Sequence, residues 1–219
     1  DAIGYPAILM DAPILVERLK EAKQLGVKSV MFAGTGEPLV HKRIPDFFKG
    51  AREAGLDYAF TTNGVLLLDK LGLPKTGLLG ATWIKVSLNA GTREGYAAIH
   101  RTDAKDWDMV WASIKSLIAI RNTTGSKTTI GVQCVVLPEN VYEMRGLANL
   151  CIDAGVDYLV LKPYSQATFM LSHKYENIDY SQMRDYLRGV VEFSTKTFKV
   201  IYRGNAINEE ISKDHGFDK

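Results

Sequence analysis

The chain has 219 residues, of which 46% are hydrophobic and 10% aromatic, so it can bury a full core and is not a disordered segment. Its 27 Lys and Arg nearly balance its 25 Asp and Glu, and a formal charge of +2 argues against a nucleic-acid-binding or anionic-membrane surface. No stretch approaches the roughly 20 apolar residues of a membrane span, and residues 1–20 lack the layout of a signal peptide. We expect a single cytoplasmic domain over residues 1–219.

The two cysteines, Cys134 and Cys151, are 17 residues apart, which matches neither a CxxC metal site nor a secreted disulfide framework. We expect both to be core residues in a reducing cytoplasm. Both ends of the sequence look cut, because Asp1 is not an initiator Met and residues 214–219 carry no helix or strand pattern. We therefore expect a domain truncated at both ends.

Helical and strand patterns alternate along the chain. Apolar spacing and glycine stops predict helices over residues 14–25, 45–55, 107–121, 140–154 and 181–195. Buried-strand runs lie between them, over residues 29–33, 57–62, 83–89, 128–136, 159–163 and 198–202. This alternation predicts an α/β fold in which helices cover a parallel sheet.

Right-handed crossovers restrict such a fold to an open doubly wound sheet or a barrel, and the repetition of similar units favours the barrel. We predict a partial (β/α)6 TIM-like barrel of parallel strands, with a first strand missing. Ligands of such folds bind at the carboxyl ends of the strands, so the candidate site residues are sought there.

The first strand ends in Gly34-Thr35-Gly36-Glu37-Pro38. The glycines let the backbone approach a ligand closely, and the Glu37 carboxylate suits an ammonium group. A tight turn with a solvated Glu would explain the motif equally well if it stood alone. The third glycine of a dinucleotide fingerprint is absent, and so is the Gly-Lys-Ser/Thr of a P-loop.

The next two strands also end in polar residues. Asn63 follows the strand 57–62, where an ordinary turn explains it equally well. Lys85, Ser87 and Asn89 share one face of the strand 83–89 by its two-residue period. Three polar side chains on an inward face are costly unless they meet a polar ligand or one another.

The fourth and fifth predicted strands carry weaker signals. Gln133 lies on the face of its strand opposite Cys134, which places Gln133 toward the barrel interior. Lys162 ends the strand 159–163, where a snorkelling lysine beside a solvent loop is at least as good an explanation.

In their order along the chain, these strand ends resemble the radical S-adenosylmethionine (SAM) superfamily. The segment 34–38 resembles its Gly-Gly-Glu-Pro motif, 61–64 a frequent Thr-Asn-Gly, and 87–89 its Ser-x-Asp/Asn stretch. Arg101 resembles the arginine that clamps the SAM carboxylate in the branch with a cysteine-rich C-terminal extension. The resemblance covers residues 26–166 and includes a Pro-Glu-Asn at 138–140.

The resemblance implies that SAM is bound by Gly34, Thr35, Gly36, Glu37, Asn63, Lys85, Ser87, Asn89, Arg101, Gln133 and Lys162. It implies a [4Fe-4S] cluster, held in the family by a Cys-x3-Cys-x2-Cys loop that this sequence lacks and that the family places just before the segment corresponding to Asp1. In an intact parent, reductive cleavage of SAM would give a 5′-deoxyadenosyl radical that abstracts a hydrogen from a small-molecule or peptide substrate.

The same resemblance implies a reductant such as flavodoxin or ferredoxin, and it places Tyr164, Ser165 and Gln166 near the substrate. His100 is expected to be a loop or core residue rather than an acid or base. The chain by itself is expected to be inactive, either because the cluster loop is cut off or because its lineage lost this chemistry.

Two other functions stay open. One is a non-redox α/β-barrel lyase or aldolase that uses Lys85 or Lys162 as an amine nucleophile. The other is a fragment that only binds or acts as a scaffold. Trapping a carbonyl substrate on Lys85 or Lys162 with borohydride would identify the first of these.

Overall fold

The computed structural model describes residues 9–34, 36–71, 77–166 and 172–204. Along the chain these form α1 (Ala12–Gln24), β1 (Ser29–Phe32), α2 (Ile44–Glu53), β2 (Asp57–Thr62), α3 (Leu67–Leu71), β3 (Trp83–Ser87), α4 (Arg93–His100), α5 (Lys105–Thr124), β4 (Thr129–Val136), α6 (Met144–Ala154), β5 (Tyr158–Pro163), α7 (Arg184–Val191) and β6 (Lys199–Tyr202). Short 3₁₀ turns lie at Pro38–Val40, Leu78–Gly80, Val141–Glu143 and Tyr180–Met183.

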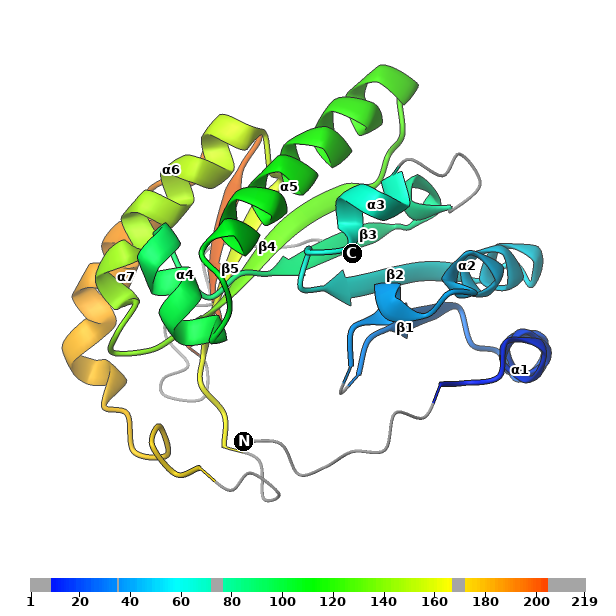
Figure 1. Ribbon diagram of the computed structural model, residues 1–219, viewed down its shortest axis with the longest axis horizontal. Helices are drawn as coiled ribbons and strands as arrows, with labels where there is room; N and C mark the ends of the chain where they lie inside the picture. The colour runs from blue at the N-terminus through cyan, green and yellow to red at the C-terminus, as the bar shows by residue number, and fades with distance from the viewer. Residues whose placement is uncertain (1–8, 35, 72–76, 167–171, 205–219) are drawn as a thin grey trace.

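The six described strands form one sheet in the order β1-β2-β3-β4-β5-β6, and every neighbouring pair is parallel. The sheet is curved, with α4, α5, α6 and α7 along its outer side and α1 and α2 beside β1 and β2 (Figure 1). This arrangement confirms the predicted partial (β/α)6 barrel. All six carboxyl ends therefore lie along one edge of the sheet, where ligands of such folds bind.

The two faces of the sheet differ in chemistry, as the two-residue strand period predicts. Lys85, Ser87 and Gln133 are half-buried on the concave inner face. The residues of β3, β4 and β5 that point to the other face are fully buried beneath the helices, and they include Ile84, Val86, Ile130, Val132, Cys134, Leu159 and Leu161. Cys134 and Cys151 are both buried and free, which confirms their prediction as core residues.

Helix ends differ in places from the predicted ranges. The helix α5 is longer than expected, and Gly125 ends it in the left-handed conformation with a φ of 67°, which glycine adopts without strain. The helices α3 and α4 were not predicted, because five and eight residues are too few to establish a helical period. The helix α7 covers only part of the predicted 181–195, since a 3₁₀ turn over Tyr180–Met183 precedes it. No helix in the described ranges is long and apolar enough to cross a membrane.

Candidate cofactor site at the strand ends

Glu37 joins the carboxyl ends of β1 and β2. Its Oε1 accepts hydrogen bonds from the Leu39 backbone N–H at 3.0 Å and from the Thr62 hydroxyl at 2.8 Å, and its Oε2 accepts one from the Asn63 backbone N–H at 2.6 Å. An ionised carboxylate has about four lone-pair positions, so about one is left for a ligand. The half-buried Glu37 is thus a fixed negative charge at the mouth of the barrel.

The glycines of the same turn leave its backbone open. Gly34 has a φ of 154°, a conformation that residues with a side chain rarely adopt. Around both Gly34 and Gly36, no heavy atom of the described residues would lie within 4 Å of an added Cβ. The turn therefore offers exposed peptide groups beside the Glu37 carboxylate. Thr35 lies outside the described residues.

Asn89 is held by three segments of the chain. Its side-chain Oδ1 accepts from the Val135 N–H at 2.8 Å, its backbone N–H donates to Nε2 of His100 at 3.1 Å, and its carbonyl accepts from Nδ2 of Asn140 at 3.0 Å. Oδ1 already extends the pairing of β3 with β4, so it has one lone pair left for the predicted SAM contact. The Nδ2 amide of the Asn89 side chain is the other group that a ligand could meet.

His100 packs inside the domain rather than facing the site. Its ring stacks on Tyr96 with the centroids 4.3 Å apart, and its Nε2 accepts the Asn89 N–H. Burial lowers the pKa of His100, which favours the neutral ring that this acceptor role requires. The position suits the structural role that the sequence predicted.

Two residues that sequence reasoning missed hold the segment after β3. Asn140 is fully buried and donates to the carbonyls of Asn89 and Val135. Glu143 accepts from the backbone N–H groups of Gly91 and Thr92 and from the Thr92 hydroxyl. The Pro-Glu-Asn at 138–140 was a visible signal, but the sequence indicated only that a helix starts there.

Arg101 ends α4 in the left-handed conformation with a φ of 54°. Among the described residues other than glycine, Arg101 is the one with a positive φ. Its N–H donates to the Ala97 carbonyl as a helix cap, and its side chain is exposed. Asn63 is also exposed, and its backbone N–H is the group that binds Glu37. The position of Asn63 beside the Glu37 turn fits its predicted place at the site.

The remaining predicted residues lie on the inner face of the sheet. Ser87 pairs in register with Gln133, so their side chains are neighbours on β3 and β4. Lys85 is half-buried, with its Nζ 5.3 Å from the ring centroid of Trp83, whereas Lys162 is exposed at the end of β5. Burial lowers the pKa of Lys85, and the positive charges of Arg203 and Lys162 lower it further.

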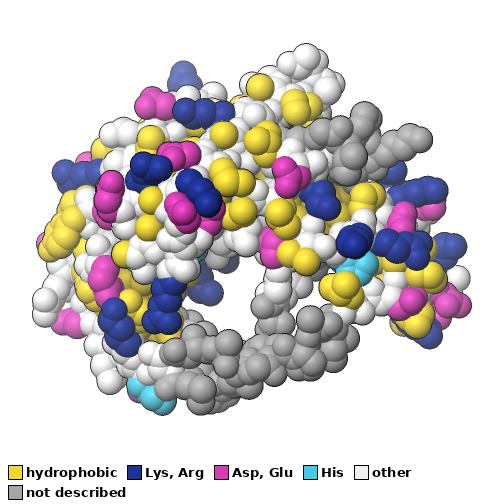
Figure 2. Space-filling model, viewed as in Figure 1, with side chains coloured by type: hydrophobic (Ala, Val, Ile, Leu, Met, Phe, Trp, Pro, Cys, Tyr) yellow, Lys and Arg dark blue, Asp and Glu magenta, His cyan; other side chains and the backbone are white. Residues whose placement is uncertain are grey.

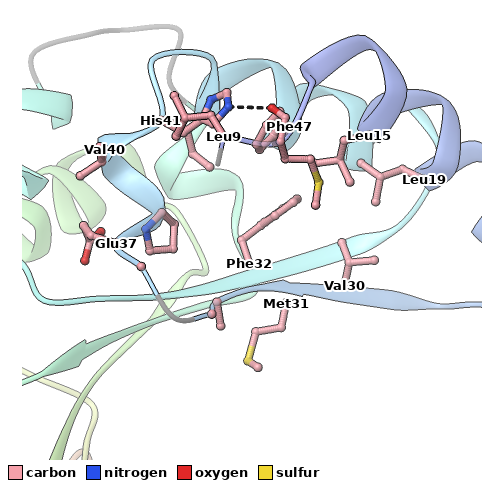
Figure 3. Close-up of a pocket in the computed structure, with 16 residues that line it drawn as sticks. Leu9, Leu15, Leu19, Val30, Met31, Phe32, Glu37, Val40, His41 and Phe47 are labelled. Atoms are coloured by element: carbon pink, nitrogen blue, oxygen red, sulfur yellow. Dashed lines mark hydrogen bonds between the residues drawn. The ribbon is translucent and has the colours of Figure 1, made fainter. Parts of the chain in front are cut away.

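A cavity of about 720 Å³ lies beside β1 on the helix-facing side of the sheet. Figure 3 shows Val30 and Phe32 pointing toward the helices, with Met31 on the other side of the strand. The lining is mainly aliphatic and aromatic, and Glu37 stands at its edge. A zwitterion such as SAM needs polar partners around its charged groups, so the strand ends are the better cofactor site.

The described residues do not fit a [4Fe-4S] cluster. The thiols of Cys134 and Cys151 are buried, and burial raises the pKa of each well above its ordinary value, against the thiolate form that binds iron. No group of three or more His, Cys, Asp or Glu side chains in the described ranges could hold a metal ion. The polar strand ends, in contrast, offer a carboxylate, hydroxyl and amide groups that suit the amino and hydroxyl groups of SAM.

Residues 3–174 match the model of the radical SAM superfamily, and the chain therefore belongs to this family. Over 155 residues it is 29% identical to a tungsten-containing aldehyde ferredoxin oxidoreductase cofactor-modifying protein of Pyrococcus furiosus. This match covers 69% of the chain and 42% of that protein. It is 31% identical over 156 residues to a GTP 3′,8-cyclase of Corynebacterium glutamicum, covering 67% of this chain and 38% of the cyclase. The chain spans less than half the length of these relatives.

Solved structures share the fold. Streptococcus suis SuiB bound to S-adenosylmethionine superposes with a TM-score of 0.66 at 18% identity, over 93% of this chain and 46% of SuiB. An archaeal TYW1 superposes with a TM-score of 0.59 at 14% identity, over 89% of this chain and 67% of that chain. At such low identity the likeness concerns the fold alone.

Proposed function

We propose that this chain forms the SAM-binding part of a radical SAM enzyme barrel. The observation that carries the proposal is the Glu37 carboxylate, which Thr62 and Asn63 hold beside an open glycine turn. A carboxylate with one free lone-pair position suits the amino group of SAM, since hydrogen bonds between charged groups are the strong ones. The family match over residues 3–174 supports the same reading.

Other strand ends would hold the rest of the cofactor. We propose that Ser87, Gln133 and the Nδ2 group of Asn89 hydrogen-bond the ribose and methionyl part, and that Arg101 binds the SAM carboxylate. Bound SAM would supply a 5′-deoxyadenosyl radical for hydrogen abstraction when a [4Fe-4S] cluster reduces it and methionine leaves. The role of these residues is to bind and orient the cofactor at the barrel mouth.

We propose that the cluster ligands come from outside these 219 residues, since both cysteines of the chain are buried. The chain alone should then be inactive, and a flavodoxin or ferredoxin would serve the intact enzyme in the cytoplasm. The relatives suggest a small-molecule or peptide substrate, because one acts on GTP by its name and SuiB has been solved with its precursor peptide SuiA.

Calorimetric titration of the chain with SAM tests the proposal. Glu37→Ala should weaken SAM binding by about 1.5–3 kcal/mol, the scale of a hydrogen bond to a charged group, which is roughly a 12- to 150-fold rise in Kd. Glu17→Ala, which removes an exposed carboxylate on α1, is the matched control and should leave the affinity unchanged. Equal affinity of the Glu37→Ala variant and the parent chain would exclude Glu37 as a SAM ligand.

One observation favours a second function, an amine nucleophile of the lyase or aldolase kind. The pKa of Lys85 is lowered by burial and by neighbouring positive charges, which increases the fraction of neutral amine. If Lys85 acts in this way, borohydride should trap a carbonyl substrate on Lys85 and not on the exposed Lys162. Absence of any trapped adduct would leave SAM binding as the supported function.

A further inference from the structure

Three cationic side chains, Lys85, Lys162 and Arg203, share the inner face of the sheet with Lys199, which lies at the amino end of β6. Lys85 on β3 pairs with Gly131 of β4, and Lys162 on β5 pairs with Val135 of β4. Gly131 and Val135 are four residues apart and lie on the same face of β4, so both lysines project from the concave face of the sheet. The N–H of Arg203 donates to the Leu161 carbonyl at 2.8 Å, which continues the ladder and places Arg203 beside Lys162. The molecule is hollowed in the middle, with Lys and Arg side chains along part of the rim (Figure 2).

These cations lack compensation by the described part of the protein. None of the three forms an ion pair with a carboxylate of the described residues. Their mutual repulsion and the half-burial of Lys85 cost free energy, as the lowered pKa of Lys85 reflects. An anion bound between them would remove this cost.

The other groups around Lys85 are neutral or already paired. Tyr158 faces Lys85 across Gly131, and burial raises the pKa of Tyr158 to about 12, so its hydroxyl stays protonated. Asp157 forms its ion pair with Arg121. The Glu37 carboxylate accepts a hydrogen bond from Thr62 at the end of β2. Thr61, which pairs with Lys85 on the inner face, is uncharged. The inner face from β3 to β6 is therefore positive.

We propose that Lys85, Lys162 and Arg203 bind an oxyanion of the substrate, a carboxylate or a phosphate, inside the barrel. The inference rests on the proposed SAM site, because it assigns Lys85 and Lys162 to the substrate that the cofactor would meet. Lys85 and Lys162 are two strands and four residues of strand rise apart, which separates their register positions by about 16 Å, a span that two long side chains can close around a ligand of several atoms. A substrate with more than one anionic oxygen, such as a diphosphate or a dicarboxylate, fits this spacing.

Titration of the chain with pyrophosphate and, separately, with succinate at constant ionic strength tests the proposal. At least one of the two should bind, and the stronger one identifies a phosphate or a carboxylate as the ligand group. Lys85→Gln, Lys162→Gln and Arg203→Gln should each raise its Kd about tenfold or more. Lys115→Gln, an exposed lysine on the outer helix α5, removes the same charge and should leave the Kd unchanged.

Binding of neither anion would overturn the proposal, and so would equal losses in the Lys115→Gln control. Displacement of the bound anion by SAM would overturn it too, because the three cations would then belong to the cofactor. Lys162 and Arg203 are exposed, so their variants should fold even if Lys85→Gln does not. Glu37→Ala separates the two proposals: it should lose SAM binding and keep anion binding.

Discussion

The hydroxyl of Thr62 donates a 2.8 Å hydrogen bond to Oε1 of Glu37, and it also accepts the Gly64 N–H at 3.0 Å. One buried side chain thus sets both the end of β2 and the carboxylate of the first strand end. Thr62 is 3% exposed and Gly64 is buried, so water cannot replace the bond to the Gly64 N–H, and the bond to Glu37 helps to orient this carboxylate.

Thr62→Val keeps the shape of the side chain and removes both bonds. We expect a loss of about 1–3 kcal/mol in the free energy of unfolding, because the buried Gly64 N–H loses its acceptor. We also expect SAM affinity to fall several-fold, since Glu37 loses one of its anchors. Urea denaturation and calorimetry measure the two effects. The hydroxyl of Thr61 forms no hydrogen bond with the described residues, so Thr61→Val should have little effect on stability.

Asn140→Leu should destabilise the domain by about 2–5 kcal/mol, because it removes three hydrogen bonds of a fully buried side chain. The Leu137 N–H then loses its acceptor, and two backbone carbonyls lose their donor. Amide exchange of Gly91 and Thr92 should also become faster, since Asn140 anchors the segment before them. Asn122→Leu on the exposed face of α5 is the control, with an expected change within about 0.5 kcal/mol. A change as small as this in Asn140→Leu would contradict its anchoring role.

The domain should lose stability in acid through His100. Burial holds the folded pKa of His100 below its ordinary 6.5, so the unfolded chain binds more protons below that pH. The free energy of unfolding should then fall as the pH drops below 6.5, by at most about 1.4 kcal/mol per pH unit for this group. His100→Gln keeps an acceptor for the Asn89 N–H and should flatten the profile, whereas the exposed His173→Gln should keep it. Parallel profiles for all three proteins would exclude His100 as the cause.

Lys85 should make the stability of the domain depend on pH on the alkaline side. Its folded pKa lies below the ordinary 10.5, so the protonated amine destabilises the fold at neutral pH, and this penalty disappears as the pH rises through the folded pKa. Lys85→Gln should therefore be more stable than the parent chain at pH 7, with an advantage that shrinks toward pH 10.5. Denaturation at several pH values measures this difference. A constant difference across the range, or the same trend in Lys115→Gln, would contradict it.

Gly131 gives Tyr158 its place in the barrel. A Cβ at position 131 would lie 2.1 Å from the Tyr158 ring, so Gly131→Ala should cost about 1–3 kcal/mol by overpacking. The cost should largely disappear when Tyr158 is also replaced by Ala, which a double-mutant cycle would reveal. Gly146→Ala, in the helix α6 with 4.0 Å to the nearest atom, should be neutral or stabilising. An undiminished cost in the double variant would show that the Tyr158 ring is not the obstacle.

The sequence by itself determined the class of the fold, and its motifs predicted where the site lies. The alternation of apolar strands with amphipathic helices is a local property of burial, and it predicted six strands and their inner and outer faces. The burial of Cys134 and Cys151 followed from the same pattern, and motif order at the strand ends indicated the superfamily. Among the α-helices in the described residues, α3 and α4 were not predicted, because they are too short to show a period.

The tertiary structure alone decided which distant side chains meet. Glu37 and Thr62 are 25 residues apart, and Asn140 and Asn89 are 51 apart, so their bonds depend on strand order and register rather than on any local pattern. Arg203 follows the last strand and carries no motif, yet the pairing of β5 with β6 places it beside Lys162 on the inner face. Parallel pairing brings residues from separate strands to one edge, and that is why the positive inner face became visible only in three dimensions.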